Sequence, residues 1–319
     1  MPARIWTPLK LISFVCACVL LLAACGTEAQ ISSDAKGNKT IVDDEASNGS
    51  KPSTEADTEY RIVSTTVAIT EILDALDLDA VGIPTTYKKL PGRFKGVTEI
   101  GNPMSPDMEL VRSLLPTHVL SVSTLEDDLK DGFEAAKVKA DFLDFTNLQS
   151  MKEEIRSLGE QFNRTELAET LITNYDGKIA ELKQRATGEP PTVMILMGVP
   201  GSYLVGTANS YIGDLVKQLG GINVVEQSDV EFISANTEYL YQGNADIILR
   251  AAHGMPDEVI KMFDEEFRTN DIWKHFKAVQ NDRVYDLPED LFGTTGNMAV
   301  EEALEALADM LYPNKRRLS

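Results

Sequence analysis

Short apolar runs alternate with longer amphipathic segments from Tyr60 to Leu311. The apolar runs are rich in branched aliphatic residues and predict buried strands. The amphipathic segments repeat apolar residues every three or four positions and predict helices. The predicted strands are residues 61–64, 81–84, 117–122, 140–145, 193–197, 202–205 and 245–249, and the predicted helices are residues 67–76, 106–115, 165–186, 211–219, 256–267 and 300–311.

Strands that alternate with helices of about ten residues are typical of a parallel α/β sheet. The alternation is interrupted once, by a helical region that includes residues 165–186 and would be about 33 Å long at 1.5 Å per residue. The sequence therefore predicts two parallel-sheet α/β lobes, residues 60–158 and 191–319, joined by a single long helix within residues 159–190. Ligands in such folds bind beyond the carboxyl ends of the strands, so we expect one in the cleft between the lobes.

Residues 1–24 have the features of a bacterial secretory signal. Arg4 and Lys10 precede an unbroken apolar run, Phe14 to Cys25, which is shorter than the roughly 18 residues that a membrane-spanning helix needs. The run ends in Leu-Ala-Ala-Cys, which resembles a lipobox. This resemblance implies cleavage before Cys25, attachment of lipid to its thiol, and a place on the outer face of the cell membrane of a Gram-positive bacterium. An uncleaved anchor is the alternative.

Residues 25–59 are rich in Ser, Thr, Asn and charged residues and contain no aromatic residue. Such a segment cannot bury enough apolar surface to offset the entropy of the chain, so we expect a disordered tether. All three cysteines lie within the first 25 residues. The exported domain therefore cannot form a disulfide, and its core must hold it together.

The chain has 30 Lys and Arg against 50 Asp and Glu, a formal charge of −20. Nucleic acids and anionic membranes attract basic patches, so this balance argues against both as the main partner. No Gly-x-Ser-x-Gly elbow, cysteine nucleophile or His-Glu-x-x-His zinc motif occurs. The sequence therefore favours a binding protein over an enzyme.

Four motifs carry a resemblance to a known family. They are Ile-Gly-Asn-Pro-Met-Ser-Pro at residues 100–106, Met-Gly-Val-Pro-Gly-Ser-Tyr-Leu-Val at 197–205, His-Gly-Met-Pro at 253–256 and Asn-Asp-Ile-Trp-Lys-His-Phe at 270–276. With the lipobox, the tether and the two lobes, they resemble the class III substrate-binding proteins of ABC importers. Within that class they resemble the haem-receptor lipoproteins of iron-regulated surface determinant systems.

The resemblance implies a haem carrier for iron acquisition. Its cargo would be haem b (iron protoporphyrin IX), and its partners an ABC permease with its ATPase and upstream haem-donor proteins at the cell surface. A siderophore or cobalamin carrier of the same fold is the first alternative, and an enzyme or electron carrier is the second. Haem whose two axial positions are filled by protein has no open site for O₂ or peroxide, which argues against an oxidase or peroxidase.

Three histidines are candidate ligands. His118 is expected inside an apolar strand and His275 in a helical segment with Trp and Phe, and both positions favour a structural or surface role. His253 differs, because it follows a predicted strand and stands beside Gly254 in a strand-end loop. Its position alone leaves a ligand role and a structural role equally open.

Met104 lies in a stiff, proline-flanked loop before a helix. Its position alone favours packing on the core, since methionine commonly fills gaps there. The resemblance implies that Met104 and His253, one from each lobe, are the axial ligands of haem iron, with Met108 and Met255 as fallback sulfur ligands. A soft thioether opposite an imidazole suits haem iron and raises its reduction potential.

Ser64, Thr65, Thr66 and Val67 join the first predicted strand to the first helix. Backbone N–H groups at a helix start accept anions, so a haem propionate could bind there. Ordinary helix capping by Thr65 or Thr66 is the alternative, and both roles can hold at once.

Four charged residues have two interpretations each. Arg61 and Arg250 could balance propionates, or they could face solvent as strand-end arginines commonly do. The resemblance places one permease-docking glutamate on the outer tip of each lobe, and the matching residues are Glu109 and Glu238. In a chain with 50 acidic residues, the alternative for each is an ordinary solvated surface.

Overall fold

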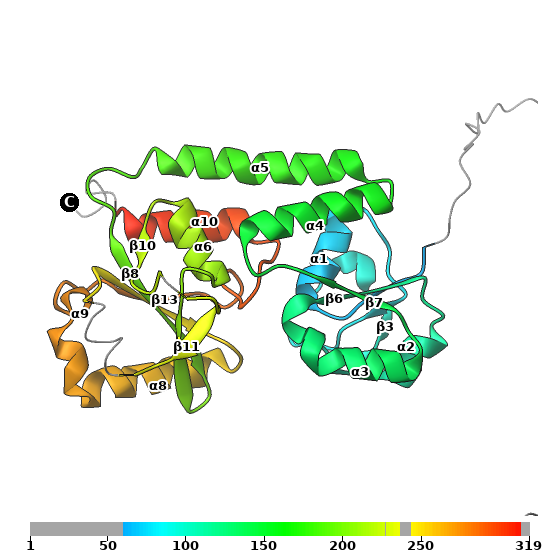
Figure 1. Ribbon diagram of the computed structural model, residues 1–319, viewed down its shortest axis with the longest axis horizontal. Helices are drawn as coiled ribbons and strands as arrows, with labels where there is room; N and C mark the ends of the chain where they lie inside the picture. The colour runs from blue at the N-terminus through cyan, green and yellow to red at the C-terminus, as the bar shows by residue number, and fades with distance from the viewer. Residues whose placement is uncertain (1–59, 227, 237–243, 314–319) are drawn as a thin grey trace, which may run out of the picture. The chain divides into compact units, whose positions relative to one another are not determined.

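The computed structural model describes residues 60–226, 228–236 and 244–313, which belong to one unit, Asp57–Ser319 (Figure 1). The predicted signal sequence, the tether at residues 25–59, Cys25 and Glu238 lie outside the described residues. The described chain builds two large sheets with helices around them. Among these residues, no helix is both long enough and apolar enough to cross a membrane.

The first sheet has five strands, all parallel, in the order β3-β2-β1-β6-β7. The elements of this first lobe are β1 (Ile62–Ser64), α1 (Val67–Ala75), β2 (Gly82–Ile83), η1 (Gly92–Phe94), β3 (Thr98–Glu99), α2 (Met108–Ser113), β6 (His118–Val122), η2 (Ser123–Leu125), α3 (Glu126–Ala136) and β7 (Ala140–Leu143). Between β3 and α2, the short strands β4 (Gly101–Asn102) and β5 (Ser105–Pro106) form an antiparallel hairpin.

The second sheet is mixed, in the order β11-β9-β8-β12-β13 with β10 also paired to β8. The elements of this second lobe are β8 (Thr192–Val199), β9 (Ser202–Gly206), α6 (Tyr211–Gln218), β10 (Ile222–Asn223), β11 (Phe232–Ser234), β12 (Ile247–Ala252), α8 (Pro256–Thr269), η3 (Asp271–His275), α9 (Lys277–Gln280), β13 (Val284–Asp286) and α10 (Val300–Leu311).

The expectation of a wholly parallel sheet is wrong for β9 and β11, which run antiparallel to their neighbours. Only Pro200 and Gly201 separate β8 from β9, whereas a parallel neighbour needs a crossover of about a dozen residues. Gly201 has φ +82°, a left-handed conformation that glycine adopts without strain.

Helix α2 begins two residues later than the pattern predicts, and Asp107 caps it. Ser105 and Pro106 belong to the β4–β5 hairpin, and the carboxylate of Asp107 accepts the N–H of Leu110 at 2.9 Å. Asp caps a helix as well as Ser does, so the hairpin could take Ser105 without leaving the helix uncapped.

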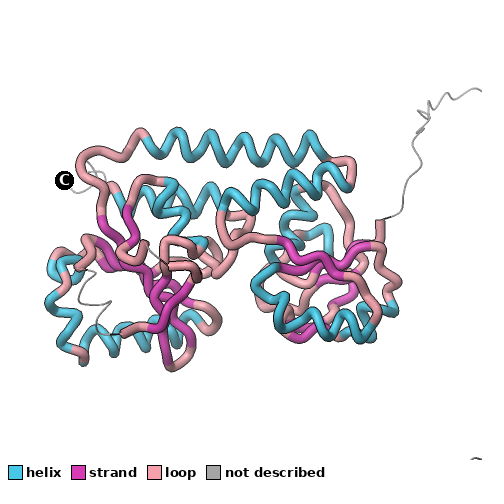
Figure 2. Tube along the Cα trace, viewed as in Figure 1, coloured by secondary structure: helices cyan, strands magenta, loops and turns pink. Residues whose placement is uncertain are grey.

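Two antiparallel helices carry the chain from the first lobe to the second. They are α4 (Leu148–Gln161) and α5 (Thr165–Lys183); α5 begins at the predicted residue and ends three residues before the predicted one. Figure 2 shows α5 alongside α4 and α10. Ion pairs tie it to both, Arg156–Glu169 on the α4 side and Lys178–Glu305 on the α10 side. Two α/β lobes with the long helix α5 leading from one to the other match the architecture that the sequence predicts.

The apolar core is continuous from one lobe to the other. Buried side chains of α1, α4, α5, α6 and α10 join Ile62 and Leu120 of the first sheet to Val193 and Ile195 of the second. Tyr175 lies on α5 within this cluster, and its hydroxyl contacts the Met298 sulfur at 3.5 Å. The lobes are therefore held by shared packing and not by the chain crossing alone.

Gly198 of β8 lies where α8 packs against the second sheet, so a substitution there tests how closely the helix must approach. A methyl group there would overlap Val259 of α8 and would lie 2.7 Å from the Phe263 ring. Gly198→Ala should therefore lower the free energy of unfolding by about 1–3 kcal/mol, the usual range for overpacking. Urea unfolding of the purified protein measures this change.

Gly177→Ala is the matched control, because Gly177 lies inside α5 with no heavy atom within 4 Å of the added methyl group. It should raise the free energy of unfolding by about 0.5–1 kcal/mol, as helix interiors favour Ala over Gly. Equal unfolding midpoints for the two variants would contradict this account of α8 packing.

Candidate functional site

The carboxyl ends of the two sheets face each other. Tyr87 follows β2 of the first lobe and Glu289 follows β13 of the second, and the tyrosine hydroxyl donates to the Glu289 carboxylate at 2.6 Å. A second bond joins Gly296, also after β13, to the carbonyl of Phe145, which follows β7, at 2.8 Å. Strand-end loops from both sheets therefore meet where ligands of α/β folds bind.

Met104 lies at the tip of the β4–β5 hairpin, just beyond the carboxyl end of β3. The side-chain oxygen of Asn102 accepts the Met104 N–H at 2.9 Å, which closes the tight turn. The Met104 side chain is 61% exposed. The interpretation of Met104 as a core-packing residue is therefore wrong, and its thioether is open to a ligand.

Backbone bonds fix the hairpin to the first sheet. The N–H of Ile100 donates to the Ile83 carbonyl at 2.8 Å, and the N–H of Thr85 donates to the Gly101 carbonyl at 2.8 Å. The base of the hairpin therefore continues the β2–β3 pairing. Met104 stands on a rigid base although its side chain is exposed.

His253 directly follows β12, the strand between β8 and β13. Its N–H donates to the Gly198 carbonyl at 2.8 Å, so the backbone keeps the strand register up to this residue. The His253 side chain is exposed. Gly254 and Met255 then take positive φ values of 73° and 48°, and the chain turns sharply into α8. This turn leaves the imidazole at the carboxyl edge of the second sheet.

The other histidines have the structural and surface roles expected of them. His118 begins β6, at the amino end of the sheet, and its ring packs edge-on against Phe162 with the centroids 4.9 Å apart. Burial lowers the pKa of His118. His275 is exposed in η3.

The segment from Ser64 to Val67 uses its polar side chains on the protein itself. Thr66 caps α1 by accepting the Ile69 N–H, which confirms the capping interpretation for this residue. Thr65 instead donates its backbone N–H to the Leu120 carbonyl at 3.1 Å and its hydroxyl to Ser121 at 2.9 Å. Apart from the Ile69 N–H, the backbone N–H groups of the first helical turn have no acceptor within the helix and remain the donors suited to an anion.

Neither candidate arginine is placed to meet a propionate. Arg250 is only 9% exposed, because β12 is an interior strand. Its guanidinium makes two 2.7 Å bonds to Asp286 and one 3.0 Å bond to Asp264, so it does not face solvent. Arg61 donates to the carbonyls of Leu114 and Leu115 at the end of α2.

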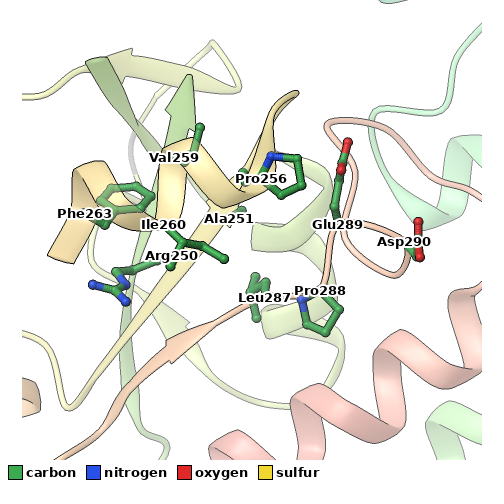
Figure 3. Close-up of a pocket in the computed structure, with 11 residues that line it drawn as sticks. Arg250, Ala251, Pro256, Val259, Ile260, Phe263, Leu287, Pro288, Glu289 and Asp290 are labelled. Atoms are coloured by element: carbon green, nitrogen blue, oxygen red, sulfur yellow. The ribbon is translucent and has the colours of Figure 1, made fainter. Parts of the chain in front are cut away.

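A cavity of about 260 Å³ lies between α8 and the loop after β13. Apolar side chains, among them Val259, Ile260 and Phe263, line most of it. Figure 3 shows Glu289 and Asp290 on the side opposite Phe263. The cavity is smaller than the roughly 300–1,000 Å³ of a typical small-molecule site, so a large planar ligand does not fit inside it.

The sequence reasoning missed the contact between the lobes at Tyr87, Lys88 and Glu289. The Lys88 ammonium lies 3.4 Å from the Glu289 carbonyl and 3.8 Å from its carboxylate. The hydrogen bond to Glu289 raises the pKa of Tyr87 to about 12, so the hydroxyl remains a donor at neutral pH. The only sequence signal was that Tyr87 and Lys88 follow the predicted strand at residues 81–84, since no strand was predicted before Glu289.

Two further expectations concern the surface and metals. Glu109 is exposed in the first turn of α2, as a docking residue must be, and Glu238 lies outside the described residues. Within residues 60–226, 228–236 and 244–313, no cluster of three or more His, Cys, Asp or Glu side chains could hold a bare metal ion.

Comparison with known proteins identifies the family. The sequence profile of the periplasmic binding proteins matches residues 62–291. The "high-affinity heme uptake system protein IsdE" of Staphylococcus aureus is 52% identical over 260 residues, which cover 81% of this chain and 89% of that protein.

Two solved structures agree in fold and sequence. The crystal structure of S. aureus IsdE complexed with heme has 52% identity and a TM-score of 0.77 and covers 80% of this chain and 99% of that one. An ABC transporter substrate-binding protein from Listeria monocytogenes has 58% identity and a TM-score of 0.76, and covers 81% and 100%.

The resemblance read from the four motifs is therefore confirmed. The relatives are substrate-binding and uptake proteins, not enzymes. The profile match extends across both lobes and their connecting helices. The chain belongs to the periplasmic binding protein family, with S. aureus IsdE among its close relatives.

Proposed function

We propose that this protein is a lipid-anchored, extracellular haem-binding protein that delivers haem to an ABC importer for iron acquisition. The observation that carries the proposal is the 52% identity with IsdE, a haem uptake protein whose structure with haem has the same fold. A siderophore or cobalamin cargo on the same fold is the alternative. A Soret band that forms on adding haem to the purified protein separates the two.

The proposed axial ligands are Met104 and His253. Two features of the geometry support this pair. Both side chains are exposed, and the two residues lie beyond the carboxyl ends of strands in different lobes. A thioether and an imidazole together hold haem iron in a six-coordinate state and favour its ferrous form. The first-turn N–H groups of α1 at Val67 and beyond are the proposed site for a propionate.

Substitution of each ligand should have a different effect. His253→Ala should weaken haem binding by about tenfold or more, which corresponds to a loss of about 1.4 kcal/mol or more of binding free energy. Met104→Ala should keep haem bound but lower its reduction potential, because the thioether favours ferrous iron. Absorption titration and spectroelectrochemistry measure the two effects.

Met255→Ala is the control for the sulfur ligand, because Met255 is also exposed, at 52%, and lies two residues from His253. It should leave the potential of the bound haem unchanged. A lower potential in Met255→Ala but not in Met104→Ala would move the ligand role to Met255. Wild-type spectra and potentials in both His253→Ala and Met104→Ala would refute the assignment.

Cys25 is the proposed lipid anchor, on the strength of the Leu-Ala-Ala-Cys sequence after a short apolar run. The tether at residues 25–59 would then connect the anchor to the haem-binding unit on the outer face of the membrane. Mass spectrometry of the protein from its producing cells should find Cys25 at the amino terminus with lipid attached, and Cys25→Ala should prevent both. A mature chain that begins downstream of Cys25 would argue against the anchor.

Glu109 and Glu238 are the proposed docking residues for the permease. An ion pair is worth under about 1 kcal/mol when exposed but more when an interface removes water from it. The double variant Glu109→Lys with Glu238→Lys should therefore abolish haem-dependent growth and leave the haem spectrum unchanged. Glu189→Lys, on an exposed loop after α5, is the matched charge reversal and should grow normally. Normal growth of the double variant would disprove this docking role.

A further inference from the structure

The contact between Tyr87, Lys88 and Glu289 bridges the two lobes. The Tyr87 hydroxyl donates to the Glu289 carboxylate at 2.6 Å, and the Lys88 ammonium contacts the same residue at 3.4 and 3.8 Å. The Glu289 side chain is only 14% exposed. We call these three residues the inter-lobe latch.

On the first lobe, the latch connects to the hairpin that carries Met104. Tyr87 and Lys88 follow β2, whose neighbour β3 leads directly into the hairpin. The bond from the Thr85 N–H to the Gly101 carbonyl, at 2.8 Å, ties the two loops together two residues before Tyr87. A shift of Tyr87 therefore moves the base of the hairpin.

On the second lobe, the latch connects to the loop that carries His253. Glu289 follows β13, which pairs with β12 in the register Arg250 with Asp286. The Leu287 N–H donates to the Arg250 carbonyl at 2.8 Å, and the Arg250 guanidinium donates two hydrogen bonds to the Asp286 carboxylate. Three residues after Arg250 the chain reaches His253.

We propose that Tyr87 and Glu289 are positioning residues, which fix the separation of the Met104 and His253 loops so that both side chains can ligate one haem iron. The inference rests on the proposed function. The iron–thioether bond is the weaker of the two axial bonds, and ligand geometries must be held within about 0.5 Å. Loss of the Tyr87–Glu289 bond should therefore weaken the bond from Met104 to the iron before it weakens the bond from His253.

The charges around the latch explain the presence of Lys88. Glu71 of α1 interacts electrostatically with Lys88 and Asp290, and Asp290 follows Glu289 in the chain, so carboxylates gather around Lys88 where the lobes meet. Burial raises the pKa of Glu71, and its carboxylate accepts the Met298 N–H at 3.5 Å. Lys88 is the cation that offsets the repulsion among these carboxylates. Lys88 therefore supports the latch, whereas the hydrogen bond from Tyr87 gives it a fixed geometry.

The test uses the purified mature protein loaded with haem. Tyr87→Phe removes the hydroxyl and Glu289→Ala removes its acceptor, whereas Glu289→Gln keeps an oxygen that can accept the same bond. The first two variants should release haem to excess apomyoglobin about threefold to tenfold faster, the range that the loss of one hydrogen bond supports. Their ferric spectra should gain a high-spin component, because part of the haem loses its sulfur ligand. Glu289→Gln should stay closer to the wild type.

Tyr203→Phe is the matched control. Its hydroxyl also donates to a glutamate, Glu266, at 3.2 Å, but both residues belong to the second lobe. This variant should keep the wild-type spectrum and release rate. Tyr87→Phe combined with Glu289→Ala should change the release rate no more than Glu289→Ala alone, since Glu289→Ala already removes the bond to Tyr87.

The outcomes separate the latch from the proposed function. If the wild-type protein binds haem but Tyr87→Phe and Glu289→Ala keep its low-spin spectrum and release rate, the latch proposal is overturned. If the wild-type protein does not bind haem, the proposed function fails instead. An equal change in Tyr203→Phe would show that the effect is general destabilisation and would also overturn the latch.

Discussion

The shared apolar core is the constraint on which the rest of the structure depends. One apolar cluster joins the two sheets through side chains of α4, α5, α6 and α10, and it contains Met151, Tyr175 and Tyr211. This packing turns the carboxyl ends of two sheets toward each other. It allows residues such as Tyr87 and Glu289, 202 positions apart, to form a hydrogen bond. Core packing therefore brings the loops of the site together without the help of a ligand.

The polar residues that look most suited to binding a charged ligand are used by the fold. Arg250 neutralises Asp286 and Asp264 within the second lobe, and its guanidinium also lies over the Phe263 and Phe267 rings. A buried arginine is stable only when its charge is paired, and Asp286 and Asp264 already supply that pairing, so Arg250 is not available to balance a propionate. The groups that remain open are a thioether, an imidazole and backbone N–H groups, which suits a ligand that is mostly apolar.

Short-range sequence patterns predicted the helices, because short-range interactions determine where a helix begins and which face it buries. The stripe from Val300 to Leu311 and the start of α5 at Thr165 were predictable, because the helix period and the flanking residues specify them. The exposed position of Met104 was not, since a loop sequence does not show which way its side chains face. The burial of Arg250 depends on β12 lying between two other strands. The Tyr87–Glu289 bond depends on how two lobes pack, which no short segment encodes.

The continuity of the core also limits how this protein can give up what it carries. Swinging the lobes apart would bring Phe145, Met151 and Tyr211 into water, at roughly 25 cal/mol for each Å² of apolar surface. Spontaneous wide opening is therefore rare, and the loaded form does not relax toward an empty, open one by itself. An importer that accepts cargo from such a carrier must either supply the free energy that separates the lobes or take the cargo without separating them widely.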